Sequence, residues 1–292
     1  MDPKKVGVLA IFGASLAWSI EPVCAKLAYD ANSTFLEISA IRAVFVMITA
    51  FVYVCLVNKA NFKITTSHLP KLIYIAIIGT VVADLLYFYA LTRIPVINAV
   101  LIGHGQPIFI ILIGFFILRE DVLTKHDYIG IAIMIVGGLA VATRTIDNLL
   151  AFKFGTVGDA VVLLATIAWA TTAIVMRKYL KHLNPGVITF YRYTIATTVL
   201  VVWVAATSSV KISNIYEPLV GIVVGIGTIL YYIALKRLKA AQTSALELST
   251  PFFSAILAFM ILKEAVTIMQ AIGVMLLVVG VYCLSRKEQT PF

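Results

Sequence analysis

Four ionisable side chains lie inside long apolar stretches of the chain, and their chemistry sets the first question. They are Glu21, Asp84, His104 and Glu247. An ionisable group at the depth of a bilayer costs ~2.5–3.5 kcal/mol on insertion scales, so each such group marks a candidate binding or proton-transfer site. The three carboxylates could hold a cation, an ammonium group or a proton, which makes Glu21, Asp84 and Glu247 the candidates for proton coupling. A buried, hydrogen-bonded structural role is the alternative for each.

Glu21 has the most specific local chemistry, because Pro22 follows it. Proline lacks a backbone donor, so we expect a helix break or kink at Pro22 that frees the carbonyl of Trp18. A carboxylate beside a free carbonyl suits a cation, an ammonium group or a bound proton. The alternative is that Pro22 only shapes the packing and that Glu21 pairs with Lys26.

Two further prolines, Pro107 and Pro251, predict helix breaks in the middle of apolar segments. Each follows a polar residue, Gln106 or Thr250. Interrupted helices at matching positions in two halves of a chain are typical of binding sites in membrane transporters.

Aromatic side chains form a third group of candidates: Trp18, Tyr87, Tyr89, Trp169, Tyr231 and Tyr232. Both tryptophans are near the middle of apolar segments, away from the interfacial belt where tryptophan is enriched. They could stack on an apolar or aromatic molecule, or they could simply pack the core.

Composition defines the environment of these residues. Of 292 residues, 61% are hydrophobic and 13% are charged, against about 25% charged in soluble proteins. Segments such as Ile94–Leu118 contain no Asp, Glu, Lys or Arg. A bilayer core needs ~20 such residues per helix. We therefore expect an all-α polytopic membrane protein, which excludes a secreted scaffold, a cytosolic enzyme and a nucleic-acid binder. The three cysteines lack metal-ligand spacing, so no metal or cofactor is expected.

Charge clusters and turn signals divide the chain into ten predicted transmembrane helices. Their ranges are 6–28, 35–57, 71–91, 95–118, 128–145, 157–178, 186–207, 218–235, 241–262 and 268–285. Helix starts are supported by Thr34 with Glu37, Thr124 with Asp127, Thr156 with Asp159, Thr267 with Gln270, and Asn184-Pro185.

The two halves of the chain, 1–150 and 151–292, repeat each other. Gly7, Ala17, Trp18 and Arg42 recur as Gly158, Ala168, Trp169 and Arg192, and Tyr87, Arg93, Pro107, Phe109 and Glu120 recur as Tyr231, Arg237, Pro251, Phe253 and Glu264. Each half holds five predicted helices, an odd number, so the second must enter the membrane inverted. Two inverted five-helix repeats with a site between them are the plan of many secondary transporters. In this repeat Glu21 corresponds to Thr172.

The basic residues predict the orientation. Fifteen of the 23 lysines and arginines fall at the ends that share the side of the N-terminus, six fall at the opposite ends, and Arg42 and Arg192 lie within spans. By the positive-inside rule both termini are cytoplasmic. The net charge of +9 then reflects contact with anionic lipid rather than nucleic acid. We place Arg42 and Arg192 within snorkelling reach of the interface, in structural roles, and find no Lys or Arg at the midplane.

The duplicated elements Gln106-Pro107 to Leu118-Arg119-Glu120 and Thr250-Pro251 to Leu262-Lys263-Glu264 resemble the drug/metabolite transporter superfamily, EamA type. With the five-plus-five layout, the resemblance covers essentially the whole chain. It implies a monomer-sized permease, often an exporter of amino acids or other small metabolites, with a cavity formed by helices one, three, four, six, eight and nine. A homodimer is the alternative assembly.

We therefore expect a multi-pass protein of the plasma or inner membrane that transports neutral, zwitterionic or cationic small molecules by alternating access. Transport of drugs, cations or nucleotide sugars is the alternative within the superfamily, although phosphate-bearing substrates are disfavoured without midplane Arg or Lys. A passive channel and an intramembrane enzyme are the alternatives from other classes. The predicted substrate-binding residues are Trp18, Glu21, Asp84, Tyr87, His104, Gln106, Trp169, Thr172, Tyr231, Glu247 and Thr250.

Overall fold

The computed structural model describes residues 3–58, 62–118, 125–153, 155–207, 211–238, 243 and 246–285, and all regular secondary structure in these ranges is helical. Eight of the described helices are long and apolar enough to cross a membrane, and two shorter apolar helices follow them, Ser249–Leu262 and Ile268–Leu284. The prediction of an all-α membrane protein is confirmed.

The first half of the chain has the following elements: α1 (Pro3–Asp30), α2 (Phe35–Val52), η1 (Tyr53–Asn58), η2 (Thr66–His68), α3 (Leu69–Ala76), η3 (Ile77–Val82), α4 (Ala83–Leu91), α5 (Val96–Gly103), α6 (Gln106–Ile113), η4 (Gly114–Leu118), α7 (Lys125–Thr143) and α8 (Ile146–Leu150). The second half has α9 (Val157–Val175), η5 (Met176–Leu180), α10 (Pro185–Thr207), α11 (Tyr216–Leu235), α13 (Ser249–Leu257), η6 (Ala258–Leu262) and α14 (Ile268–Ser285). The short helix α8 was not predicted.

The helices begin close to the predicted positions because their caps are formed. Thr34 and Glu37 make a reciprocal capping box at the start of α2, and Thr156 and Asp159 do the same for α9. The oxygen of Asn184 accepts from two backbone amides at the start of α10. Thr124, Arg119, Glu120, both chain ends and most of 241–245 lie outside the described residues.

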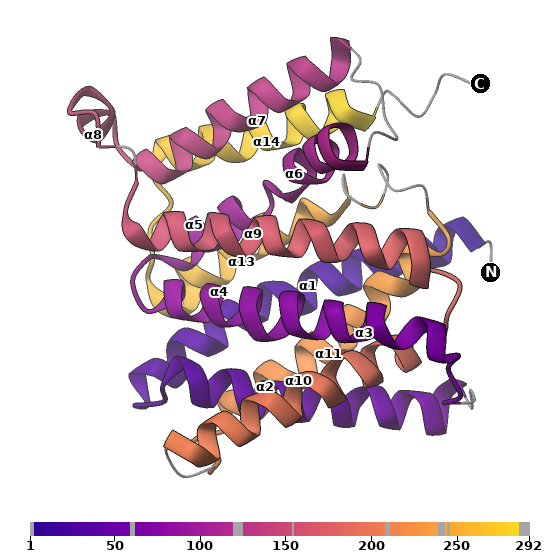
Figure 1. The fold of residues 1–292 in the computed structure, drawn as a ribbon. Helices are drawn as coiled ribbons and strands as arrows, with labels where there is room; N and C mark the ends of the chain where they lie inside the picture. The colour runs from indigo at the N-terminus through magenta and orange to yellow at the C-terminus, as the bar shows by residue number, and fades with distance from the viewer. Residues whose placement is uncertain are drawn as a thin grey trace.

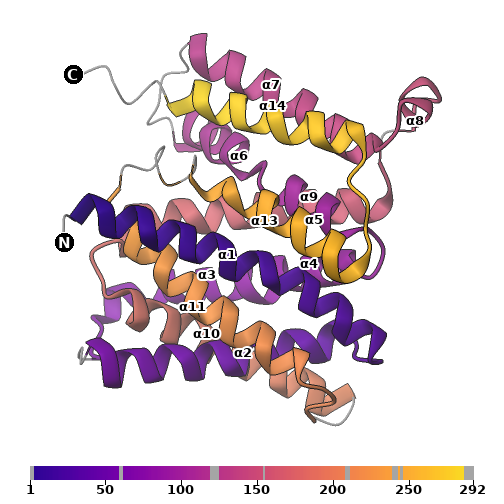
Figure 2. The ribbon, with the colours of Figure 1, turned by 180° about the vertical axis from the view of Figure 1, so that it is seen from behind.

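The helices form a bundle with one separate layer, as Figures 1 and 2 show. In the bundle α1 lies beside α11, α2 lies beside α10 and α11, and α4 lies beside α9. The last helices of the two halves, α7 and α14, pair with each other above the bundle (Figure 1). The described start of α1 and the described end of α14 lie at the same end of the molecule, and α8 lies at the other end (Figures 1 and 2). The two ends of the bundle are therefore distinguishable.

Glycines on both helices of the α7–α14 pair allow its close crossing. A Cβ placed on Gly130 would lie 2.9 Å from the carbonyl oxygen of Gly280, and one on Gly137 would lie 3.1 Å from that of Gly273. Small residues at such crossings let membrane helices pack by van der Waals contact. The same device brings α11 onto α2, where a Cβ on Gly221 would lie 2.7 Å from the carbonyl oxygen of Arg42.

Buried polar contacts tie the halves together at the end of the bundle where α1 ends. Ser33 donates to Glu217 over 2.6 Å at the start of α11. The Asn98 amide in α5 donates to Asp159 over 2.9 Å, and the Gln270 amide donates to Asn98 over 2.5 Å. Each contact joins the first half to the second. Separating the halves at this end would break these buried hydrogen bonds.

We expect Gly137→Leu to destabilise the protein by about 1–3 kcal/mol, because the new side chain would collide with the backbone of α14. The matched control is Gly138→Leu on the same helix, since a Cβ on Gly138 meets no atom within 4 Å. Thermal unfolding of both purified variants in detergent makes the comparison. Equal unfolding midpoints for the two variants would show that the glycine contact does not hold α7 on α14.

Candidate functional site

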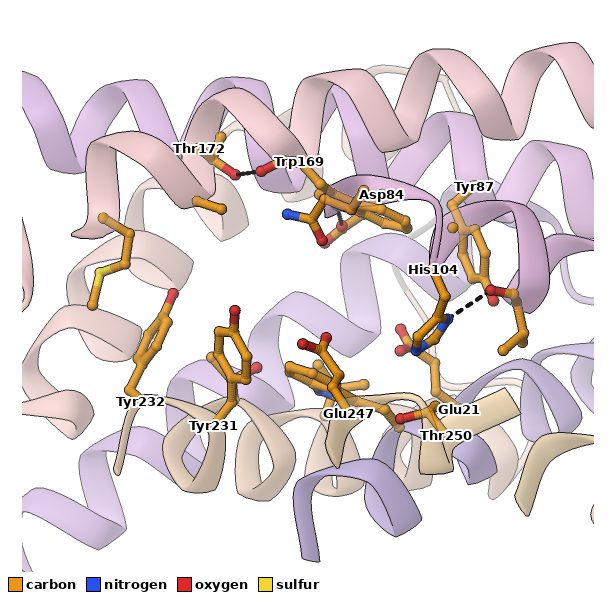
Figure 3. A pocket seen from close by; sticks show the side chains of 18 of the residues that line it. Glu21, Asp84, Tyr87, His104, Trp169, Thr172, Tyr231, Tyr232, Glu247 and Thr250 are labelled. Atoms are coloured by element: carbon orange, nitrogen blue, oxygen red, sulfur yellow. Dashed lines mark hydrogen bonds between the residues drawn. The ribbon is translucent and has the colours of Figure 1, made fainter. Parts of the chain in front are cut away.

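A cavity of about 210 Å³ lies within the bundle, and all eleven predicted substrate-binding residues line it. Figure 3 shows ten of its lining residues labelled around one hollow. They come from both halves of the chain: Glu21, Asp84, Tyr87 and His104 from the first, and Trp169, Thr172, Tyr231, Tyr232, Glu247 and Thr250 from the second. Their placement is an observation, while their contact with a substrate stays a prediction.

Helix interruptions position two of these groups. The fourth span breaks at His104 and Gly105, so that α6 begins at Gln106 with Pro107 in its first turn. The α13 helix begins at Ser249, with Pro251 again in the first turn. Proline suits the first turn because its missing N–H would have no helical acceptor there. At Pro22 the outcome differs: α1 runs through it as one helix, so the interruption predicted at Pro22 is not present.

A buried ion cluster forms one wall of the cavity. The Arg42 Nε lies 2.8 Å from a carboxylate oxygen of Glu21, and its Nη1 lies 2.6 Å from Oδ2 of Asp84. The other oxygen of Asp84 accepts a 2.8 Å hydrogen bond from the Trp169 ring nitrogen. The guanidinium also lies over the rings of Phe88 and Tyr193, 5.3 and 5.7 Å from their centroids. The cluster joins α1, α2, α4 and α9.

The predicted position of Arg42 near the interface is therefore wrong, as is the alternative pairing of Glu21 with Lys26. Arg42 is 5% exposed. The arginine side chain is long enough to point either way along its helix, and a direct ion pair to two carboxylates outweighs partial hydration at the interface. The composition of α2 alone does not reveal those partners, since they belong to α1 and α4.

Arg192 also lines the cavity, which corrects the expectation that no Arg lies there. Its Nε donates to the Thr80 hydroxyl over 2.8 Å, and its Nη1 donates to the Tyr232 hydroxyl over 3.2 Å. The ring of Tyr193 lies 5.3 Å from the guanidinium carbon. The absence of a central cation was the ground for disfavouring phosphate-bearing substrates, and that ground no longer holds.

Two of the residues that line the cavity hold buried polar atoms without protein partners. The Nδ1 of His104 lies 2.7 Å from the carbonyl oxygen of Val100. A carbonyl only accepts, so Nδ1 carries the proton in the neutral ring and Nε2 is left as an acceptor. This Nε2 and the Thr250 hydroxyl have no hydrogen-bond partner among the described residues. Glu247 points into the hollow (Figure 3) and makes no ion pair within 4.0 Å in the described part of the chain.

Aromatic rings complete the lining. Trp18 and Tyr231 lie with ring centroids 5.0 Å apart, and Tyr87 and Trp169 lie 5.3 Å apart. Each pair takes one ring from each half of the chain. Rings in such contact present apolar faces to the hollow while their polar atoms can bind at the edge.

Residues along much of the length of the bundle line the cavity. Met176 and Leu235 lie toward the end where α1 begins, whereas Ala99, three residues from the start of α5, lies toward the end where α1 ends. Lining residues thus approach both ends of the bundle.

Comparison with known proteins decides the family. The sequence profile of the EamA-like transporter family matches residues 5–143 and 156–286. The chain belongs to this family. The EamA profile thus matches one segment in each half, and the two segments together carry every residue of the cavity.

Relatives of this EamA-type chain are transporters by name. An uncharacterized transporter of Synechocystis sp. is 28% identical over 234 residues, covering 75% of this chain and 66% of the relative. The chain thus spans about two thirds of that protein's length. A pseudopaline exporter of Pseudomonas aeruginosa is 23% identical over 295 residues, covering 99% of both chains. One solved crystal structure shares the fold with a TM-score of 0.68 at 16% identity, covering 98% of this chain and all of the other.

Sequence reasoning missed several residues at the cavity. They are Arg42, Thr80, Arg192, Tyr193 and Thr228, of which Thr80 contacts Arg192 and the others line the cavity. The two arginines carried a usable signal, since an ionisable residue inside an apolar span is a functional candidate by default. Their recurrence at one offset was a second signal.

We expect Arg42→Met to destabilise the protein by about 3–5 kcal/mol, because Glu21 and Asp84 would then be buried without a counter-charge. Adding Asp84→Asn should recover part of this loss, since one uncompensated charge is removed. The exposed residue Arg93 supplies the control Arg93→Met. Chemical denaturation in detergent gives the stabilities of wild type, Arg42→Met, Asp84→Asn, the double variant and Arg93→Met. Strictly additive effects of Arg42→Met and Asp84→Asn would refute the pairing.

Proposed function

We propose that the chain is a secondary transporter that carries small organic solutes across the plasma or inner membrane by alternating access. The observation that carries the proposal is the central cavity, which both halves line with charged, polar and aromatic side chains. Such groups are costly in a membrane unless they serve a bound molecule or each other. The transporter names of the relatives support the same class of activity.

We further infer ten membrane spans arranged as two inverted five-helix repeats. Eight long spans and the two shorter apolar helices supply the number. Matching positions of the halves meet at the cavity: Trp18 and Trp169, Arg42 and Arg192, and Tyr87 and Tyr231. Residues related by an inverted repeat face one another across its axis, which is where such transporters bind their substrates.

Alternating access requires the contacts between the halves to open at one end at a time. Hydrogen bonds between the halves occur at both ends of the described bundle, Ser33 with Glu217 where α1 ends and Tyr191 with Phe62 where α1 begins. Rocking the halves about the cavity would break these contacts alternately. We place the end where α1 begins in the cytoplasm, since most basic residues fall there.

Amino acids and related zwitterionic or cationic metabolites are the proposed substrates, with export as the direction. The relative named as a pseudopaline exporter supports export. Proton coupling is assigned to Glu21, Asp84 or Glu247, and Glu247 is favoured because the other two are occupied by Arg42. A carboxylate without an ion pair can exchange a proton without breaking one. The protein acts as a monomer in this proposal.

Transport is tested in proteoliposomes by counterflow of labelled amino acids, with and without a pH gradient. We expect saturable flux, and a loss of more than tenfold in Gly103→Leu, because a Cβ there already lies 3.6 Å from the Trp169 ring and the larger side chain would fill the cavity. Gly138→Leu, outside the cavity, should keep most of the flux. Unsaturable flux would indicate a channel, and no flux of any solute would contradict the proposal.

The membrane orientation is tested by labelling single cysteines introduced into a chain whose three native cysteines have been replaced. Asp147→Cys in α8 should react with an impermeant maleimide on intact cells, whereas Ser67→Cys in η2 should react only after permeabilisation. Both side chains are exposed. Reaction of both positions on intact cells, or the reverse pattern, would refute cytoplasmic placement of the α1-start side.

A further inference from the structure

The two buried arginines of the repeat have different surroundings, although they occupy matching positions. Arg42 is neutralised by Glu21 and Asp84. The positions that correspond to these acids in the second half are Thr172 and Thr228. Both threonines line the cavity, as Arg192 does. The second half therefore has the cation but a neutral residue at both acidic positions.

The contacts of Arg192 are all to neutral groups. Two of its nitrogens donate to the hydroxyls of Thr80 and Tyr232, and no carboxylate of the described residues lies within 4.0 Å of the guanidinium. The nearby Asp84 is not free to pair with it, since its two oxygens are taken by Arg42 and Trp169. The Nη2 of Arg192 has no acceptor among the described residues, so its N–H groups are available to a bound molecule.

A cation in such a place calls for an anion. Glu21, Asp84 and Arg42 together leave one negative charge that offsets Arg192 at a distance, but none of these carboxylates contacts its guanidinium. Buried charges in proteins are almost always paired directly, because hydrogen bonds must replace the lost hydration. Arg192 lines the cavity, so an anion that enters can reach it. The planar guanidinium fork matches the two oxygens of a carboxylate.

We propose that Arg192 is the anion-binding residue of the cavity and pairs with a carboxylate of the transported solute. This inference rests on the proposed function and narrows its substrate class. The solute carries a carboxylate that lies between Arg192, Tyr232 and Thr172, at the side of the hollow where Tyr232 and Thr172 are seen in Figure 3.

The opposite side of the cavity supplies the complementary chemistry. Glu247 points into the hollow, and His104 and Thr250 lie beyond it, on the side away from Tyr232 (Figure 3). Glu247 corresponds to Gly103 in the repeat, so this carboxylate also lacks a counterpart in the other half. The Glu247 carboxylate fits an ammonium. A solute with both groups would span the cavity between two poles of opposite charge, with its side chain against the aromatic rings.

Thr172 offers a direct way to test the role of Arg192. The Thr172 side chain and Nη2 of Arg192 both lie within 3.3 Å of where a Cβ on Gly79 would be, so the two side chains are neighbours. Thr172→Glu would restore the acid present at the matching position of the first half. The new carboxylate should occupy Arg192 and exclude that of the solute. Thr172→Gln is the matched control, with the same size and no charge.

The experiment measures binding by calorimetry to the purified protein in detergent, with the proteinogenic amino acids and their amides as probes. Wild type should bind at least one amino acid tenfold or more tightly than its amide. Arg192→Gln and Thr172→Glu should abolish this preference while leaving the affinity for the amide within twofold, and Arg192→Lys and Thr172→Gln should keep part of it. Thermal midpoints of the variants show which of them are folded.

Three results would overturn the proposal: no amino acid preferred over its amide by wild type, an equal loss for amino acid and amide in Arg192→Gln, or tighter binding of phenyl phosphate than of phenylacetate. Counterflow separates this inference from the proposed function. Flux without a carboxylate preference would leave a transporter in which Arg192 is structural, whereas a carboxylate preference without flux would leave a binding site without transport.

Discussion

The organisation of this protein depends on one buried guanidinium shared by two carboxylates. Arg42 draws Glu21 of α1 and Asp84 of α4 to itself, and Asp84 in turn holds the ring nitrogen of Trp169 in α9. Each of these charges alone would be costly in a bilayer. Together they compensate one another, so four helices must meet at one point for any of them to be tolerated. The cavity lies beside this point, and Glu21, Arg42, Asp84 and Trp169 all line it.

The two halves share a scaffold and differ in chemistry. Glycines, prolines and aromatic rings recur at matching positions and build similar helices, breaks and ring pairs. The acids do not recur. Glu21 and Asp84 of the first half correspond to neutral residues in the second, and Glu247 of the second half corresponds to a neutral residue in the first. The backbone geometry is thus repeated in the two halves, while the charges that the two halves contribute to the cavity differ. A symmetric scaffold with an asymmetric field can hold a molecule in a single orientation.

Much of this arrangement could be predicted from the sequence, because hydropathy, capping residues and the internal repeat are local signals. The span 268–285 was predicted with the bounds of α14, and the cap residues of α2 and α9 act as expected. The set of cavity residues followed from polar groups in apolar segments. Side-chain direction did not follow: Arg42 was placed toward the interface because its partners lie on other helices. The π-helical turn η3, directly before Asp84 and α4, has no compositional signature, and neither does the continuity of α1 through Pro22.

The glycine contact between α7 and α14 has a consequence for the halves as separate pieces. Gly130 and Gly137 find their counterparts only in Gly280 and Gly273 of the other half. In a half synthesised by itself, the backbone at these glycines would contact lipid. Lipid would not reproduce the close packing that the other helix provides. We therefore expect that neither half folds stably without the other, although each matches the family profile separately. The fold should tolerate a break in the chain around α8 if both halves are made in the same membrane, because the glycine contact between α7 and α14 would bring them together.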